Sequence, residues 1–345
     1  MFKSRTVFVV GAGASYELGF PLGSELRDRV GKMADFRFQD GSQLHSGDPV
    51  MQAALHSSYR KSQLDPNLAY RAGRAMSAGL PLAISIDNYL EAHSTGEHVQ
   101  TVGKLGIVRA ILQAEGNTKL TVRQSRGRSK VDFSDTTLQA SWLTRLVRNL
   151  TEGVKREDTE SLFGNVSFIT FNYDRSLEEF LWRALQTYYD MAETQAAQLV
   201  GTHVVHHAYG SVGRLPWQNG DGPEAPYGED VEPGVLLELS KRILTFSEQV
   251  ERAHHAALIE RLAEARTVVF LGFGFLEQNM QLLELQGMRT AERVYATALG
   301  FSKSDCEVIA ERIREVLGDD TLSVELRNDL SAAQLFGEYS RSITQ

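Results

Sequence analysis

The sequence predicts an α/β protein built on a doubly wound parallel β-sheet, with a helical insertion after the first strand–helix unit. Apolar runs rich in β-branched and aromatic residues recur without polar alternation, which is typical of strands buried on both faces. Segments with helical periodicity separate these runs, and such alternation is the pattern of a doubly wound sheet. The five runs are residues 7–10, 166–171, 203–208, 267–273 and 293–299.

Helices are predicted after three of these strands. Residues 16–30 follow the first strand, residues 174–189 follow the second, and residues 304–317 follow the fifth. The last two segments carry apolar side chains three and four positions apart, so each presents one apolar face to a sheet.

The stretch between the first two strands interrupts this alternation, because residues 35–165 are polar and mostly helical in character. Its strongest amphipathic pattern covers residues 138–154. We therefore expect a Rossmann-like core formed by residues 1–34 and 166–345 and a helical insertion subdomain formed by residues 35–165.

The composition narrows the classes of partner. The chain has 345 residues with 44 acidic and 36 basic side chains, and a net charge of −8 argues against broad electrostatic binding of nucleic acid. The single cysteine, Cys306, excludes an internal disulfide. Neither a signal peptide nor a run of about 18 apolar residues is found, so a cytoplasmic protein without membrane contact is expected.

Two loops stand out between the predicted elements. Residues 116–130 carry five basic side chains (Lys119, Arg123, Arg126, Arg128 and Lys130) and form either a solvated loop or a binding arm. Residues 210–234 are rich in glycine and proline and predict a long irregular loop, and loops of such length inside a compact domain are often functional.

The first motif is the turn Gly11-Ala12-Gly13-Ala14-Ser15, which lies between the first strand and the first helix. Glycines let the backbone approach a ligand closely, and N–H groups at a helix start favour a phosphate. Tyr16 replaces the third glycine of the dinucleotide fingerprint. The motif predicts nucleotide binding, and the alternative is a tight turn without a ligand.

The second motif closes the second strand, where Thr170, Asn172 and Asp174 follow one another at alternate positions. Ligands of open α/β sheets bind beyond the carboxyl ends of strands, so Asn172 can hold a ribose hydroxyl or a water there. Asp174 also stands where the N-cap of the next helix belongs, and this role does not exclude contact with a substrate.

Two further motifs end later strands. His206 and His207 precede Gly210, and a neutral imidazole can accept a proton from a hydroxyl or a water. The two histidines point to opposite faces of a strand, so at most one reaches the site; His207 is the candidate base and His206 the alternative. The fourth motif contains Gly272, Gly274 and Asn279, and is either a second nucleotide contact or a simple turn.

These four segments, in this order, resemble the sirtuin family over residues 7–299. The resemblance implies a Rossmann-like domain with NAD⁺ in an extended groove, bound by residues of all four motifs. It also implies that Asn172 positions the nicotinamide ribose, that a histidine is the general base, and that Asp174 lies near the nicotinamide carboxamide.

The chain departs from deacetylase sirtuins in two ways. Those proteins carry a four-cysteine zinc ribbon, whereas no cysteine lies between His207 and Leu271, so no zinc or other metal is expected. They also place histidine directly before glycine, where this chain has Tyr209. Both departures make the chain similar to the sirtuin-like NAD⁺ hydrolases of bacterial anti-phage defence, as does the segment 85–90, whose Asp87 borders the site or caps a helix.

The resemblance therefore implies hydrolysis of NAD⁺ to nicotinamide and ADP-ribose. The alternatives are a protein ADP-ribosyltransferase or deacylase, and a sensor that binds NAD⁺ or ADP-ribose without turnover. A permanently active NAD⁺ hydrolase is toxic, so we expect gating by homo-oligomerisation or by a partner. The resemblance points to a HerA-type ATPase or an Argonaute-like protein as that partner.

Overall fold

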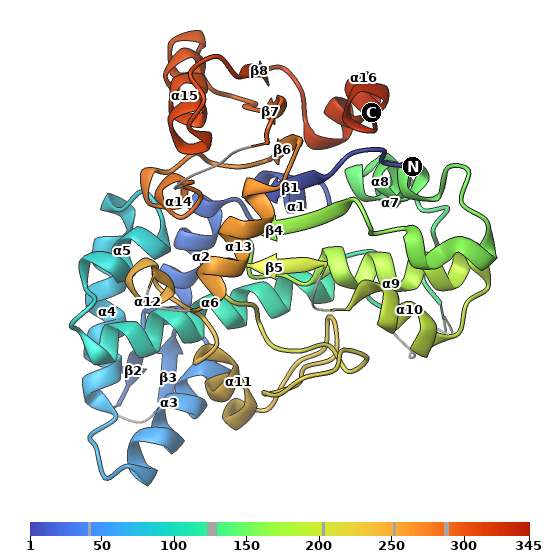
Figure 1. Ribbon diagram of the computed structural model, residues 1–345. Coiled ribbons are helices and arrows are strands. Elements are labelled where there is room, and N and C mark those ends of the chain that lie inside the picture. The colour runs from blue at the N-terminus through green and yellow to red at the C-terminus, as the bar shows by residue number, and fades with distance from the viewer. Residues whose placement is uncertain (41–42, 123–129, 202–203, 251–252, 286–289) are drawn as a thin grey trace.

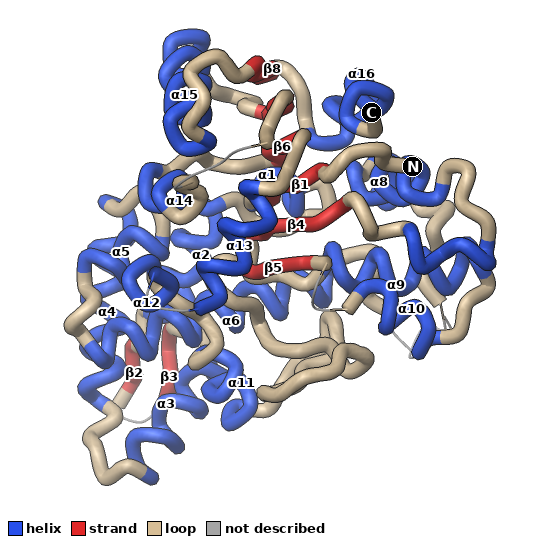
Figure 2. Tube along the Cα trace, viewed as in Figure 1, coloured by secondary structure: helices blue, strands red, loops and turns tan. Residues whose placement is uncertain are grey.

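The computed structural model describes residues 1–40, 43–122, 130–201, 204–250, 253–285 and 290–345. Six parallel strands form the central sheet in the order β5-β4-β1-β6-β7-β8 (Figures 1 and 2). Their bounds are β1 Thr6–Val10, β4 Val166–Thr170, β5 Val205–His207, β6 Thr267–Leu271, β7 Arg293–Thr297 and β8 Ser323–Arg327. The predicted Rossmann-like α/β fold is confirmed. Strand β1 lies inside the sheet, between β4 and β6, and all five of its residues are buried.

A helical region lies between β1 and β4, as predicted. It contains α2 Gly23–Ala34, α3 Pro49–Lys61, α4 Asn67–Gly79, η1 Leu80–Leu82, α5 Ile86–Ala92 and α6 Glu97–Asn117. It also contains a feature that the periodicity does not show, an antiparallel pair of strands, β2 Arg37–Gln39 and β3 Gln43–Ser46. Figure 1 shows these helices grouped beyond the ends of β4 and β5, where the strands' carboxyl ends lie.

The remaining helices are α1 Ala12–Tyr16, α7 Thr136–Ala140, α8 Trp142–Thr151, η3 Arg156–Ser161, α9 Ser176–Tyr189, α10 Glu193–Val200, α11 Pro233–Ser240, α12 Phe246–Val250, α13 Ala253–Ala263, α14 Glu277–Gln281, α15 Lys303–Leu317 and α16 Ala332–Ile343. Among them, α11 packs on α3 and α6 of the helical region, and α12 packs on α5 and α13. Helix α8 packs on α16 and α9, whereas α2 packs on α4 and α6. The domain boundaries at residues 34 and 166 remain a prediction.

Two predicted helices are interrupted. The helix expected over residues 16–30 is divided into α1 and α2, because Gly19 takes a positive φ of 91° and Pro21 disfavours helical geometry at the preceding residue. The helix expected over residues 138–154 is divided at Ser141, whose side chain caps α8 by accepting from the Thr144 N–H.

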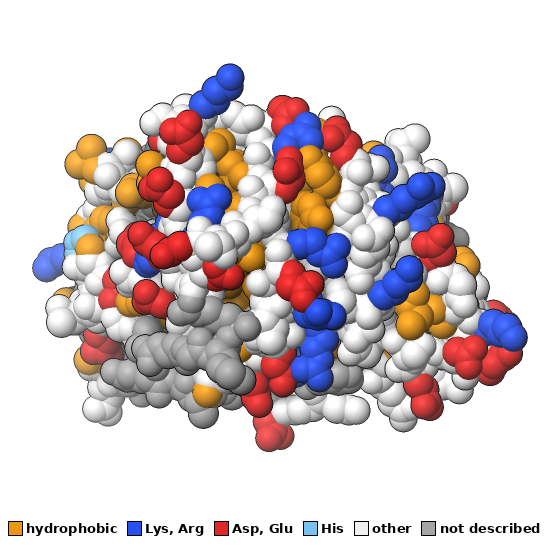
Figure 3. All heavy atoms as spheres, turned by 45° about the horizontal axis from the view of Figure 1, so that its top comes forward, with side chains coloured by type: hydrophobic (Ala, Val, Ile, Leu, Met, Phe, Trp, Pro, Cys, Tyr) orange, Lys and Arg blue, Asp and Glu red, His pale blue; other side chains and the backbone are white. Residues whose placement is uncertain are grey.

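The described surface agrees with the modest net charge. On the face in Figure 3, acidic and basic side chains are interspersed over the described residues. In the basic loop 116–130, Lys119 lies 3.6 Å from Asp135, while residues 123–129 lie outside the described part. No helix in the described ranges combines the length and the apolar character that crossing a bilayer requires.

Candidate functional site

The site residues predicted from the sequence follow four neighbouring strands of the sheet. Strand β1 pairs with β4 on one side and β6 on the other, and β4 pairs with β5. The turns that begin at Gly11, Phe171, Ala208 and Gly272 therefore all lie at one edge of the sheet. This edge is where open α/β sheets bind their ligands.

A hydrogen-bonded chain joins the first two motifs. The Asn172 side-chain amide donates both to the Gly11 carbonyl (3.0 Å) and to Ser15 Oγ (2.9 Å), and Ser15 Oγ donates to Asp174 Oδ2 (2.8 Å). Thr170 Oγ1 accepts from the Asn172 backbone N–H at 3.1 Å. Because both amide hydrogens of Asn172 are used, its Oδ1 is the atom suited to accept from a hydroxyl or a water.

The glycines of the first turn are required by packing against the fourth motif. A Cβ on Gly11 would lie 2.6 Å from the Gly272 carbonyl oxygen, and a Cβ on Gly13 would lie 2.8 Å from Gly272 Cα. Gly272 itself has a φ of 57°, and its Cβ would meet the Ala14 nitrogen at 2.0 Å. The two glycine turns therefore form one close backbone contact.

Backbone N–H groups that were predicted to bind a phosphate donate hydrogen bonds within this contact instead. The Gly11 N–H donates to the Leu271 carbonyl and the Gly13 N–H to the Gly272 carbonyl, each at 2.9 Å, and the Ala14 N–H donates to Gly11. Helix α1 has only five residues, from Ala12 to Tyr16, so it offers less of a helix dipole than the predicted helix. Phosphate binding at Gly11–Ser15 remains a prediction.

The other two predicted glycines differ in their surroundings. Gly210 has a φ of 76°, and a Cβ there would lie 2.0 Å from the Arg242 carbonyl oxygen, so packing explains it. Apart from Gly274 and its two chain neighbours, no described residue has an atom within 4 Å of a Cβ built on Gly274, so a ligand can approach the backbone there. Next to Gly274, Phe275 takes a φ of 50°, which is strained for a bulky side chain. Strain of this kind clusters at functional sites.

Asp174 is buried beneath the first turn. Its Oδ1 accepts from the Ser176 N–H at 3.0 Å, so it does satisfy the start of α9, although the residue at the N-cap position is Arg175. Burial raises the pKa of Asp174, hydrogen bonds from Ser176 and Ser15 oppose this, and the charge of Glu178 adds to it. Asp174 therefore combines the capping role with contact to the Asn172 network.

His207 lies on the β5 side of this network with both ring nitrogens in contact with acceptors. Nδ1 lies 2.9 Å from the Asn172 carbonyl oxygen, and Nε2 lies 2.7 Å from Glu178 Oε1. Burial lowers the pKa of His207, but the Glu178 carboxylate, the Asn172 carbonyl and Asp174 together outweigh it, so the pKa is raised. The choice of His207 over His206 as a base remains a prediction.

Asn279 and Asp87 lie at the same edge within a second polar group. The Tyr209 hydroxyl donates to Asn279 Oδ1 at 2.7 Å, and the Tyr173 hydroxyl donates to Asp87 Oδ1. Asp87 does not cap α5, because the N-cap is Ser85, whose side chain accepts from the Asn88 N–H. Asp87 instead connects the helical region to the residue that follows Asn172, and burial raises its pKa.

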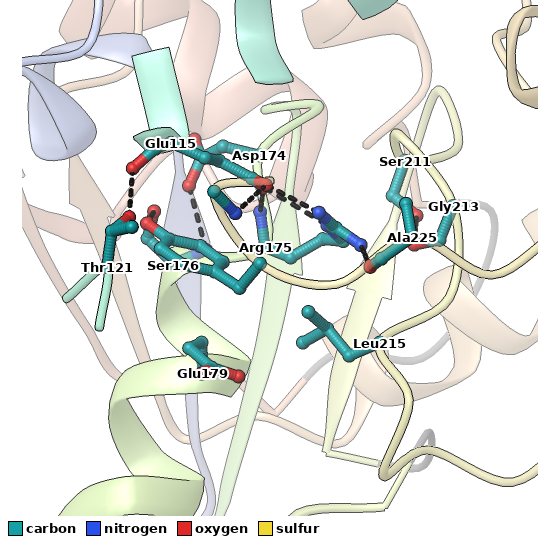
Figure 4. A network of polar contacts seen from close by, with 12 residues as sticks. Glu115, Thr121, Asp174, Arg175, Ser176, Glu179, Ser211, Gly213, Leu215 and Ala225 are labelled. Atoms are coloured by element: carbon teal, nitrogen blue, oxygen red, sulfur yellow. Dashed lines mark hydrogen bonds and ion pairs between the residues drawn. The ribbon is translucent and has the colours of Figure 1, made fainter. Parts of the chain in front are cut away.

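Sequence reasoning missed three charged residues beside the site. Arg175 and Glu115 form a buried ion pair, 1% and 0% exposed, that joins the end of α6 to the start of α9 (Figure 4). Arg175 also donates to the Ala225 carbonyl in the long loop at 2.6 Å. Glu178 is the third. The sequence marks it only as an acidic residue in the first turn of α9.

In the comparison with protein families, part of the chain matches the SIR2-like domain. No curated protein matches the chain. The described residues contain no group of three or more His, Cys, Asp or Glu side chains placed to hold a metal ion. A SIR2-like domain implies an activity connected with NAD⁺ and suggests an NAD⁺-consuming enzyme. The matched segment includes Asn172, His207 and Gly272, and Gly11–Ser15 precedes it. Residues 166–307 match the family model of the SIR2-like domain.

Proposed function

We propose that the protein hydrolyses NAD⁺ to nicotinamide and ADP-ribose. The observation that carries the proposal is the chain of hydrogen bonds from Asn172 through Ser15 to Asp174, at the edge of the sheet where the SIR2-like segment meets the glycine turn. We propose that NAD⁺ contacts the residues predicted from the sequence, namely Gly11–Ser15, Thr170, Gly210, Gly272, Gly274 and Asn279.

The leaving group needs no proton from the protein, because nicotinamide leaves as a neutral molecule. The bond between ribose C1′ and the nicotinamide nitrogen breaks, its electron pair leaves with neutral nicotinamide, and a water oxygen bonds to C1′ with release of one proton. The protein lowers the barrier by holding the ribose and the water in line. Asn172 Oδ1 orients the water or the ribose hydroxyl, and the pair formed by His207 and Glu178 takes up the proton.

Nicotinamide release by the Asn172→Ala variant tests this proposal. We expect a loss of roughly 10²-fold or more in kcat, because misplacing a reacting group by about 1 Å has an effect of that order. Asn165→Ala is the matched control. Asn165 precedes β4 at the opposite edge of the sheet, and its side chain donates to the Phe2 carbonyl at 3.0 Å. Equal activity of wild type and Asn172→Ala would contradict the assignment.

The same assay separates the alternative functions. A protein ADP-ribosyltransferase releases nicotinamide only when a protein acceptor gains ADP-ribose, and a deacylase consumes an acyl-lysine peptide in the same step. A sensor binds NAD⁺ or ADP-ribose in calorimetry and releases no nicotinamide. Free ADP-ribose formed in equal amount to nicotinamide supports hydrolysis over all of these.

We further propose that the enzyme depletes NAD⁺ in a bacterial anti-phage response and is gated by assembly. The gate is homo-oligomerisation or a HerA-type ATPase or Argonaute-like partner. Measuring nicotinamide release and native mass together, with and without the neighbouring gene products, tests this idea. Activity should rise with assembly, and a fully active monomer would show that no such gate exists.

A further inference from the structure

Glu178 lies between two hollows at the candidate site. It lines a pocket of about 10 Å³ together with Ser15, Asn172 and Asp174. It also lines a separate cleft of about 190 Å³ together with His207 and Arg242. A volume near 10 Å³ is at the lower limit for one water molecule, and a water needs two to four polar partners of the kind found here.

One of the two carboxylate oxygens of Glu178 has a hydrogen-bond partner among the described residues, and the other has none. The residue is 4% exposed, and its Oε1 accepts from His207 Nε2 at 2.7 Å. Its Oε2 is buried and has no hydrogen-bond partner among the described residues. Leaving a buried acceptor unsatisfied is destabilising, and more so for a charged group, so such an atom in a native site requires an explanation.

His207, by contrast, has no nitrogen left for a substrate in this arrangement. Both nitrogens face acceptors, the Asn172 carbonyl and Glu178 Oε1, and an imidazole donates at both positions only in its charged form. An imidazolium has no lone pair with which to accept a proton. The proton-accepting atom of the pair is therefore Glu178 Oε2.

We infer that Glu178 accepts the proton from the attacking water and that His207 is the residue that positions it. This inference rests on the proposed NAD⁺ hydrolysis. The water oxygen bonds to ribose C1′ while its proton passes to Glu178 Oε2, and the electrons of the C1′–nitrogen bond leave with nicotinamide. Asn172 Oδ1 accepts from the second hydrogen of the same water, and the protonated carboxyl then returns its proton to solvent through the cleft.

Glu178→Gln is the variant that tests the inference, because it keeps the shape of the side chain and removes its basicity. Glu179→Gln is the matched control. Glu179 is the next residue of α9, is 2% exposed, and accepts from Arg183 Nε at 2.6 Å and from Trp217 Nε1 at 2.9 Å, away from both hollows. We expect kcat for nicotinamide release to fall roughly 10²–10⁴-fold in Glu178→Gln, with NAD⁺ affinity retained.

A second measurement reports on the pair without any turnover. Titration of the His207 ring by NMR should give a lower pKa in Glu178→Gln than in wild type, because the carboxylate that raises it is gone. Asp174 keeps part of the effect, and Arg242, Arg214 and Asp221 line the same cleft in both proteins. Glu179→Gln should leave this titration unchanged.

The outcomes separate the inference from the proposed function. An active wild type with an equally active Glu178→Gln overturns the role of Glu178 and leaves NAD⁺ hydrolysis intact. A wild type that releases no nicotinamide in any assembly state overturns both. An equal loss of kcat in Glu179→Gln, or an unchanged His207 titration in Glu178→Gln, contradicts the specific role of this carboxylate.

Discussion

Two buried acid–base pairs flank Asp174, and they differ in how completely their atoms are bonded. In the pair of Arg175 and Glu115, the guanidinium donates to both carboxylate oxygens and to the Ala225 carbonyl. The pair of His207 and Glu178 lies one turn further along α9 and leaves one carboxylate oxygen, Glu178 Oε2, without a partner among the described residues.

The difference separates a pair that only holds the structure together from a pair that is able to take up a proton. An arginine in a protein stays charged, so a fully bonded arginine–carboxylate pair holds three segments of the chain together and cannot move a proton. A histidine changes its charge near neutral pH, and a carboxylate with an open oxygen can accept a proton. Both pairs cost desolvation energy, and the second leaves open the carboxylate oxygen that we propose accepts the proton of the attacking water.

The largest effect is expected from Arg175→Met, which leaves the Glu115 carboxylate buried and uncompensated. Removing one partner of a buried ion pair costs about 3–5 kcal/mol in the free energy of unfolding. Urea denaturation measures this loss. Arg266→Met is the control, because Arg266 and its partner Glu292 are both exposed, at 58% and 51%. A loss of less than about 1 kcal/mol in Arg175→Met would contradict the structural role of the pair of Arg175 and Glu115.

A smaller effect is expected from Ser15→Ala, which breaks the chain that joins Asn172 to Asp174. The variant deprives Asp174 Oδ2 of its donor and the Asn172 amide of an acceptor. The cost is about 1–3 kcal/mol, because buried polar groups are left unsatisfied. Thermal and urea unfolding measure it, and Ser57→Ala is the control, because Ser57 is exposed on α3. A neutral result at Ser15 would contradict the predicted cost of breaking this chain of hydrogen bonds.

The smallest effect is a dependence of stability on pH from the pair of His207 and Glu178. The folded pKa of His207 lies above its ordinary value of about 6.5, so the charged form is favoured in the folded state. Its contribution is fully present below that ordinary value and is lost as pH rises through the raised folded pKa. The stability difference between wild type and Glu178→Gln should shrink across this window in urea titrations from pH 5.5 upward.

Most of the central sheet was predictable because its strands are buried on both faces. The runs that became β1, β4, β6 and β7 are apolar and β-branched, and β5 was the weakest. Strand β8 was missed because it lies at the sheet edge, where Ser323, Glu325 and Arg327 mix polar residues into a short strand. The hairpin of β2 and β3 was missed for the same reason, since its residues are exposed or half-buried.

The partly bonded carboxylate and the arginine pair could not be predicted, because their partners are distant in sequence. Arg175 and Glu115 are 60 residues apart, and His207 and Glu178 are 29 apart. Local periodicity places each of these residues on a helix or strand, and only the packing of α6, α9 and β5 brings them together. The strand-end motifs, by contrast, were found because a parallel sheet itself gathers the carboxyl ends of its strands.

The Glu115 carboxylate has a consequence for the modularity of the chain. It accepts from Arg175 beside the proposed active site and from the Gly228 backbone in the long loop, while its own backbone belongs to α6 of the helical region. The helical region is therefore not a separate module that can be removed from the chain. An engineered transplant of residues 166–307 into another scaffold would leave Arg175 as a buried cation without its carboxylate, so the minimal portable unit must carry α6 with it.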